Sequence, residues 1–121
     1  MTPLLDEPPA TPMPRLGDPA PPFTATTTQG EISFPSDYAG RWVILFSHPA
    51  DFTPVCTTEF VGFQKRADDF AALGTKLIGL SVDDIDDHHA WIAWIADHLQ
   101  VGVEFPIIDD KDRAISLLLG M

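Results

Sequence analysis

The residue with the clearest potential for chemistry is Cys56, the only cysteine among the 121 residues of the sequence. It follows an apolar stretch, Trp42 to Ser47, and a loop with Pro49 and Pro54, and it opens a segment with helical periodicity. In α/β proteins, reactive groups often lie beyond the carboxyl end of a strand, at the amino end of the next helix. The backbone N–H groups there favour an anion, and the thiolate is the reactive form of cysteine. We therefore expect Cys56 to be a nucleophile, partly shielded but within reach of solvent.

Three neighbours of Cys56 carry groups suited to a thiol site. Thr53 lies three residues earlier, so its hydroxyl is expected to hydrogen-bond the thiolate or a substrate, and it also suits the cap of a helix. Pro49, together with Pro54, is expected to stiffen the loop and shield the sulfur from bulk water. His48 is expected to reach the same pocket, where a charged or donating imidazole favours the thiolate. The alternatives are a His48 that only packs at the strand end and a Cys56 that is an inert buried cysteine.

The pattern around Cys56 favours one reaction and leaves a second open. The sequence has no Cys-x-x-Cys, which excludes a two-thiol redox motif. A lone thiolate suits oxidation by a peroxide: it attacks one oxygen, the other leaves, and the cysteine becomes a sulfenic acid. The alternative is a cysteine hydrolase that uses Cys56 and His48, but no third group that would orient the histidine is evident.

Composition limits the partners and the compartment. Acidic residues outnumber basic ones by 18 to 7, and the net charge is −11, which argues against nucleic acid and anionic membranes as partners. No apolar run approaches the length of a membrane span, and the first residues carry no secretory signal. A single cysteine cannot form an internal disulfide, so we expect a reducing, cytoplasmic compartment.

The chain divides into a tail and one domain. Residues 1–15 form a proline-rich N-terminal tail, and residues 16–121 alternate between strand-like and helical patterns. This alternation predicts an α/β fold with a largely parallel sheet. The expected strands are 23–28 and 31–34 as a hairpin, 42–46 and 76–82 as runs buried on both faces, and 105–108; the expected helices are 56–73, 83–100 and 109–119.

The acidic run from Asp83 to His89 raises the question of a metal site. Asp84 and His88 are four residues apart, a spacing that places two ligands on one face of a helix. Adjacent histidines point in different directions, however, and acidic residues are ordinary at the start of a helix. We therefore expect neither a metal nor a cofactor.

Together these residues resemble the active-site signature of the peroxiredoxins, Pro49-x-x-x-Thr53-x-x-Cys56. The wider run FSHPADFTPVCTTE is similar to that of the one-cysteine subclass. The resemblance implies a thioredoxin-like fold with a central mixed sheet, and the reduction of hydrogen peroxide and organic hydroperoxides. By position, Cys56 matches the peroxidatic cysteine, Thr53 the hydroxyl that orients thiolate and peroxide, Pro49 the shielding proline, and His48 the histidine beside the cysteine.

The resemblance also implies partners and a longer chain. With one cysteine, the sulfenic acid must be reduced by an external thiol, such as glutathione or a redox protein, and the full-length family forms homodimers. The family's pocket arginine comes from a later strand than any in this sequence. We therefore expect residues 16–121 to be the front portion of the domain, incomplete at its C-terminal end. The alternative is a catalytically impaired fragment that acts only through self-association or partner binding.

Overall fold

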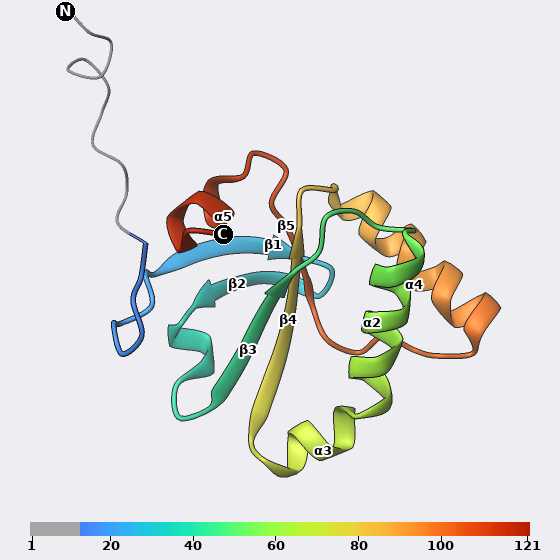
Figure 1. Ribbon diagram of the computed structural model, residues 1–121, viewed down its shortest axis with the longest axis horizontal. Coiled ribbons are helices and arrows are strands. Elements are labelled where there is room, and N and C mark those ends of the chain that lie inside the picture. The colour runs from blue at the N-terminus through green and yellow to red at the C-terminus, as the bar shows by residue number, and fades with distance from the viewer. Residues whose placement is uncertain (1–12) are drawn as a thin grey trace, which may run out of the picture.

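A computed structural model describes residues 13–121, so most of the expected tail lies outside the described residues. Five strands form one sheet in the order β2-β1-β5-β4-β3 (Figure 1). The pairs β3–β4 and β4–β5 are parallel, whereas β1 is antiparallel to both β2 and β5. The predicted α/β class, the mixed sheet and the N-terminal hairpin are confirmed. The strands are β1 (Phe23–Thr27), β2 (Gly30–Phe34), β3 (Trp42–Ser47), β4 (Thr75–Ser81) and β5 (Ile107–Asp109).

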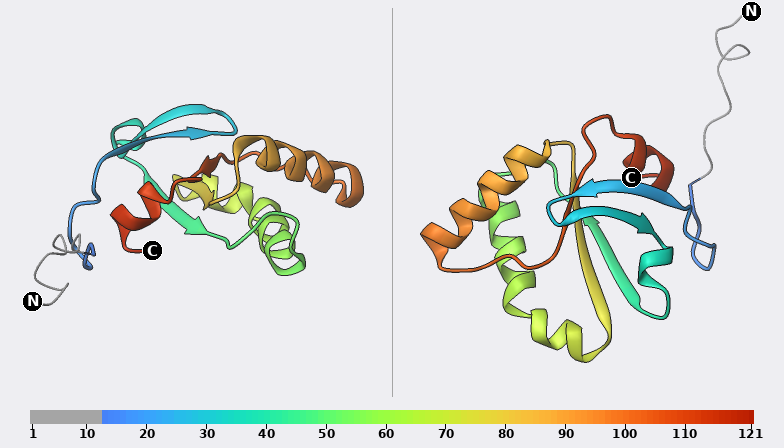
Figure 2. Two further views of the ribbon diagram at one scale, coloured as in Figure 1. Left: turned by 90° about the horizontal axis from the view of Figure 1, so that it is seen from above. Right: turned by 180° about the vertical axis from the view of Figure 1, so that it is seen from behind.

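The helices lie on both sides of the sheet. Figures 1 and 2 show α2 and α4 close together, with α5 at the other end of the molecule. The helix expected over residues 56–73 is instead two helices, because the backbone at Arg66 leaves the helical region at φ −103° and ψ 12°. The helical elements are the 3₁₀ turn η1 (Ser36–Tyr38), α2 (Pro54–Lys65), α3 (Ala67–Ala72), α4 (Ile85–Leu99) and α5 (Ala114–Leu119).

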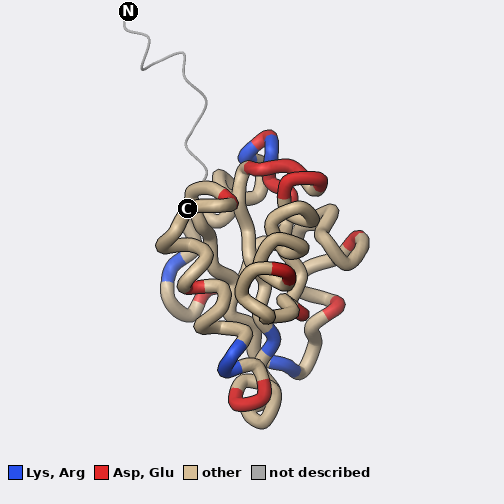
Figure 3. The backbone as a smooth tube through the Cα atoms, turned by 90° about the vertical axis from the view of Figure 1, so that its right-hand side faces the viewer, with Lys and Arg blue, Asp and Glu red and all other residues tan. Residues whose placement is uncertain are grey.

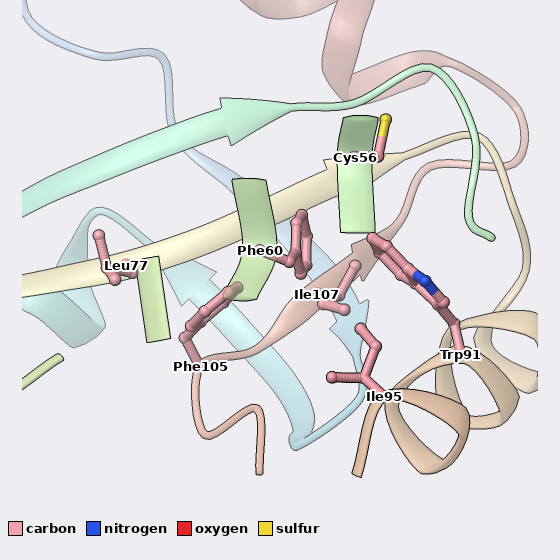
Figure 4. Packing of buried hydrophobic residues seen from close by; sticks show 7 residues of the cluster. All are labelled: Cys56, Phe60, Leu77, Trp91, Ile95, Phe105 and Ile107. Atoms are coloured by element: carbon pink, nitrogen blue, oxygen red, sulfur yellow. The ribbon is translucent and has the colours of Figure 1, made fainter. Parts of the chain in front are cut away.

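The two faces of the sheet bury separate apolar clusters, because side chains alternate along a strand. On β4, Leu77 joins the cluster beneath α2 and α4, whereas Ile78 and Leu80 join the cluster beneath α5. A Cβ at Gly79 of β4 would lie 2.9 Å from Cζ of Phe60, so this glycine lets the ring of Phe60 pack directly on the strand. The first cluster is drawn in Figure 4: Cys56, Phe60, Leu77, Trp91, Ile95, Phe105 and Ile107.

Strand β3 is an edge strand, and the prediction that it is covered on both faces holds only in part. Val43 and Leu45 pack against the second cluster. Trp42 is 77% exposed and Ile44 is 38% exposed, whereas Phe46 packs against the first cluster. A continuous apolar run therefore occurs here although one face of the strand is only partly covered. Within residues 13–121, no helix combines the length and apolar character needed to cross a bilayer.

Helix α5 starts later than the sequence predicts, for a local reason. The carboxylate of Asp110 accepts hydrogen bonds from the backbone N–H groups of Ile115 and Ser116, at 3.0 and 2.9 Å. Asp110 is only 1% exposed. This acidic residue is therefore a buried cap of a short helix, not a solvated first turn.

Candidate active site

Cys56 lies in the first turn of α2, as the sequence predicts. Thr53 is the N-cap residue, and Pro54 occupies the first turn, where its missing N–H costs nothing. The thiol is free and only 4% exposed, so the expected partial exposure is wrong. Figure 4 shows the sulfur pointing away from the other labelled side chains of the cluster. Cys56 therefore lies at the edge of the first core cluster and is not open to solvent.

Thr53 supports the loop instead of capping the helix with its side chain. Its hydroxyl donates a hydrogen bond to the carbonyl oxygen of Ala50 at 3.0 Å, and no side-chain cap is formed. Its own carbonyl oxygen accepts from the N–H and from the hydroxyl of Thr57, at 2.9 and 2.8 Å. Because the hydroxyl hydrogen is used, Thr53 presents only oxygen lone pairs to a neighbouring group.

The two remaining predicted residues differ in their surroundings. His48 is 5% exposed, and its ring centroid lies 4.8 Å from that of Phe60 and 5.0 Å from that of Trp91. It therefore packs on the same cluster as Cys56, although no hydrogen bond joins His48 to Cys56 in the described chain. Pro49 is exposed, in the loop that follows β3.

A buried carboxylate joins two histidines in this region. Oδ1 of Asp51 lies 2.6 Å from Nε2 of His48, and Oδ2 lies 2.6 Å from Nδ1 of His88. The second ring nitrogen of His88, Nε2, lies 3.0 Å from the carbonyl oxygen of Ile108 in β5. We call His48, Asp51 and His88 the relay. It connects the loop after β3 to α4 and β5.

The relay changes the protonation of its members. Burial alone would raise the pKa of Asp51, but the hydrogen bonds from His48 and His88 and the positive charge of His88 outweigh it and hold this pKa below its usual value. Burial alone would lower the pKa of His88, but the hydrogen bond and negative charge of Asp51 raise it. The two shifts favour an imidazolium–carboxylate pair.

Acidic residues surround the start of α4. Figure 3 shows the longest acidic stretch at the upper end of the molecule, with further acidic residues along its length. Asp83 accepts a 2.6 Å hydrogen bond from the backbone N–H of Asp51, which fixes the loop to the end of β4. Asp84 caps α4 by accepting from the N–H of Asp87 at 2.9 Å. The negative charge of Asp84 raises the pKa of Asp87.

The ligand pair considered from the sequence, Asp84 and His88, does not form, since His88 points to Asp51. His48, Asp51 and His88 do bring donor atoms within 4.8 Å of one another. The two nitrogen–oxygen distances of 2.6 Å are those of charge-assisted hydrogen bonds with a proton between the atoms. The structure therefore describes a hydrogen-bonded relay here.

Helix α4 also contacts the first turn of α2 directly. Nε1 of Trp91, a fully buried residue, donates a hydrogen bond to the hydroxyl oxygen of Thr57 at 3.1 Å.

Sequence reasoning missed Asp51, Thr57 and the role of His88. A signal was present, because His88 shares the helical spacing of Trp91 and Ile95 and so had to lie on the buried face of α4.

The comparisons with known proteins agree with this fold. Residues 16–121 match the AhpC/TSA family. The chain therefore belongs to this family, and the resemblance to the peroxiredoxins is confirmed.

Individual relatives show how much of a peroxiredoxin the chain contains. It is 53% identical over 111 residues to a peroxiredoxin of Methanocaldococcus jannaschii, covering 90% of this chain and 51% of that protein. The solved structure of a yeast mitochondrial 1-Cys peroxiredoxin has a TM-score of 0.85 and 47% identity, covering 90% of this chain and 52% of that one. The thiol resolving mechanism of that protein uses the glutathione and thioredoxin systems. Peroxiredoxin 6 of Arenicola marina gives a TM-score of 0.81 and 39% identity, with 87% and 49% covered. The thioredoxin-like fold is thus confirmed, and the chain spans about half the length of the relatives it matches.

Proposed function

We propose that the protein is a thiol-dependent peroxidase that reduces hydrogen peroxide and organic hydroperoxides through a sulfenic acid at Cys56. One observation carries the proposal: Cys56 lies in the first turn of α2, after the loop that follows β3, in a chain that matches the AhpC/TSA family over residues 16–121. The helix start supplies N–H groups and a dipole that favour negative charge on sulfur. The proposed physiological role is antioxidant defence and redox homeostasis.

In the proposed reaction, the sulfur of Cys56 attacks the terminal oxygen of the peroxide. A sulfur–oxygen bond forms, the oxygen–oxygen bond breaks, and the leaving oxygen takes up a proton to give water or an alcohol. We assign Thr53 the role of accepting a hydrogen bond from the peroxide, since its own hydrogen is given to Ala50. His48 and Pro49 complete the proposed pocket.

Access to the sulfur requires movement in this proposal. A thiol that is 4% exposed meets a peroxide only after the loop from Pro49 to Thr53, or the first turn of α2, moves aside. Phe52 and Val55, which are close to Cys56 in the sequence, are candidates for this movement, because they are 50% and 68% exposed.

The reductant and the assembly are also proposals. The single cysteine requires an external thiol, glutathione or a redox protein, to return the sulfenic acid to a thiol. We propose a cytoplasmic location, a homodimer for the full-length protein, and no role for nucleic acid, membrane, metal or cofactor. Residues 16–121 are then the front portion of a peroxiredoxin domain.

The test is a peroxide-consumption assay with glutathione or thioredoxin as reductant. The unchanged chain should consume hydrogen peroxide catalytically, and Cys56→Ser should abolish this activity. Full activity in Cys56→Ser would refute the assignment, and a folded, inactive wild-type chain would support the second candidate below.

The second candidate is a fragment that acts by self-association, and the exposed edge strand favours it. Trp42 is 77% exposed on β3, whose outer edge has no paired strand within residues 13–121. Such an edge pairs readily with another copy of the same strand. Light scattering after size exclusion tests this: the fragment hypothesis predicts a dimer that Trp42→Lys converts to a monomer.

A further inference from the structure

The starting point is His88, whose two ring nitrogens both have oxygen partners. The carbonyl oxygen of Ile108, 3.0 Å from Nε2, can only accept, so Nε2 must carry a hydrogen. Nδ1 lies 2.6 Å from Oδ2 of Asp51. If Asp51 is a carboxylate, Nδ1 also carries a hydrogen and His88 is an imidazolium. If the proton lies on Oδ2 instead, the remaining contacts of Asp51 are unchanged.

Asp51 transmits this constraint to His48. With Oδ2 committed to His88, Oδ1 is an acceptor, and the ring nitrogen 2.6 Å away, Nε2 of His48, must donate to it. Two backbone hydrogen bonds hold the loop in this arrangement. The N–H of Asp51 donates to the carboxylate of Asp83 at 2.6 Å, and the N–H of His48 donates to the carbonyl oxygen of Leu80 at 3.0 Å.

The remaining nitrogen of His48 then has a defined state. Nδ1 of His48 is the one buried side-chain nitrogen or oxygen without a hydrogen-bond partner among the residues that the structure describes. A neutral imidazole carries one N–H, and that hydrogen is on Nε2, so Nδ1 is a bare lone pair. A second proton there would add a buried, unpaired charge beside His88, and the single carboxylate of Asp51 already neutralises one imidazolium. The site therefore contains an unoccupied buried acceptor.

We propose that Asp51 and His88 are positioning residues of the peroxidase site, which hold His48 as the Nε2–H tautomer so that its Nδ1 lone pair serves as the proton acceptor. This inference rests on the proposed function. In the closed structure no hydrogen bond joins Nδ1 to the sulfur of Cys56, so the proton transfer follows the loop movement that the proposed function already requires. Nδ1 then takes the thiol proton of Cys56, the sulfur attacks the terminal peroxide oxygen, and the proton passes from Nδ1 to the leaving oxygen. The balance is one thiol and one peroxide giving one sulfenic acid and one water or alcohol, with His48 unchanged.

The first test needs no activity and so is independent of the proposed function. Nitrogen-15 NMR of histidine-labelled, reduced full chain at pH 7 reports each tautomer directly. The expected result is a neutral His48 protonated at Nε2 and a His88 protonated at both nitrogens. A His48 protonated at Nδ1, or at both nitrogens, would overturn the proposal whatever the peroxidase activity.

The second test uses two substitutions at Asp51. In Asp51→Asn, the amide oxygen can still accept from His48, and the amide nitrogen can donate to a neutral His88 whose Nε2–H remains on Ile108. We expect His48 to keep its tautomer and the rate of Cys56 oxidation to stay within about threefold of wild type. In Asp51→Leu, His48 should lose its tautomer preference. Cys56 should then be oxidised at least about tenfold more slowly than in wild type, as expected for a lost acid–base group.

The control is Asp97→Asn, which changes an exposed carboxylate near another histidine, His98, at 3.9 Å. It should leave both readouts unchanged. An Asp51→Leu variant that keeps the Nε2–H tautomer and the wild-type rate contradicts the proposal. If Asp51→Leu does not fold, the wild-type NMR result and Asp51→Asn still decide. Absence of sulfenic acid in wild type, with the expected tautomers, would instead refute the proposed function and leave the relay in place.

Discussion

Trp91 donates its indole hydrogen to the hydroxyl oxygen of Thr57 over 3.1 Å, which links α4 to the residue that follows Cys56. The same hydroxyl donates to the carbonyl oxygen of Thr53 at 2.8 Å. The first turn of α2 is thus held from one side by a buried aromatic residue and from the other by the N-cap backbone. The position of the thiol depends on packing between two helices as well as on its own loop.

Replacement of Trp91 tests this link. Trp91→Phe removes the hydrogen bond and leaves space in a fully buried site, so the free energy of unfolding should fall by about 2–4 kcal/mol. Chemical denaturation measures this change. Trp94→Phe, at a position that is 38% exposed, should cost less than about 1 kcal/mol. Equal losses in the two variants would show that the Trp91–Thr57 contact contributes nothing specific.

The relay makes stability depend on pH. The pKa of His88 is raised above 6.5 in the folded protein. The contribution of His88 to the free energy of unfolding is therefore complete below pH 6.5 and is lost as pH rises through the raised pKa. The pKa of Asp51 is lowered from 3.8 in the folded protein. The contribution of Asp51 to the free energy of unfolding is therefore complete above pH 3.8 and is lost as pH falls through the lowered pKa. The relay therefore stabilises the fold most between these two values.

His88→Gln provides the measurement of that dependence. At pH 6 this variant should be less stable than wild type by about 3 kcal/mol, because it leaves a buried carboxylate without its charged partner. The difference should shrink toward pH 9. His98→Gln, at an exposed position, is the matched control and should show a small difference at both values. A constant difference for His88→Gln between pH 6 and pH 9 would contradict an ion pair.

Gly79 tests the direct packing of Phe60 on β4. In Gly79→Ala, the added Cβ would lie 2.9 Å from Cζ of Phe60, so overpacking should destabilise the protein by about 1–3 kcal/mol. Gly62→Ala in α2 is the control, because nothing lies within 4 Å of its Cβ position, and alanine should stabilise that helix by about 0.5–1 kcal/mol. A neutral Gly79→Ala variant would argue against the close contact.

Thr53 separates loop support from chemistry. Thr53→Val removes the hydroxyl that donates to Ala50, and we expect a loss of about 1 kcal/mol in stability and at least about tenfold in the rate of Cys56 oxidation. Thr53→Ser retains a hydroxyl and should recover most of the rate. Time-resolved mass spectrometry of peroxide-treated protein measures the rate. A Thr53→Val variant with the wild-type rate would remove Thr53 from the proposed site.

Local sequence patterns predicted the elements that depend on local forces. The hairpin, the parallel strands β3 and β4 and the placement of Cys56 after β3 follow from alternation, from apolar runs and from the turn residues that separate them. The break at Arg66 and the short α5 were not predictable in the same way. The second of these depends on Asp110, whose carboxylate turns inward to cap the helix once β5 is in place.

The relay lay beyond sequence reasoning because it joins residues that are distant in the chain. Asp51 and His88 are 37 residues apart, and only the pairing of β4 and β5 brings Ile108 to the second nitrogen of His88. Likewise, the exposure of Trp42 reflects the position of β3 at the sheet edge, which an apolar run does not specify. The burial of Cys56 depends on the packing of α2 against α4. The local sequence does not specify this packing, so the sequence predicted a more open thiol.

The most direct test of the central claim is the intact mass of the purified chain before and after one equivalent of hydrogen peroxide, with a sulfenic-acid trap present. The proposal predicts a single trapped adduct on Cys56 in wild type and none in Cys56→Ser. A folded wild-type chain that acquires no adduct while its thiol remains free would contradict the assignment of Cys56 as the residue that peroxide oxidises.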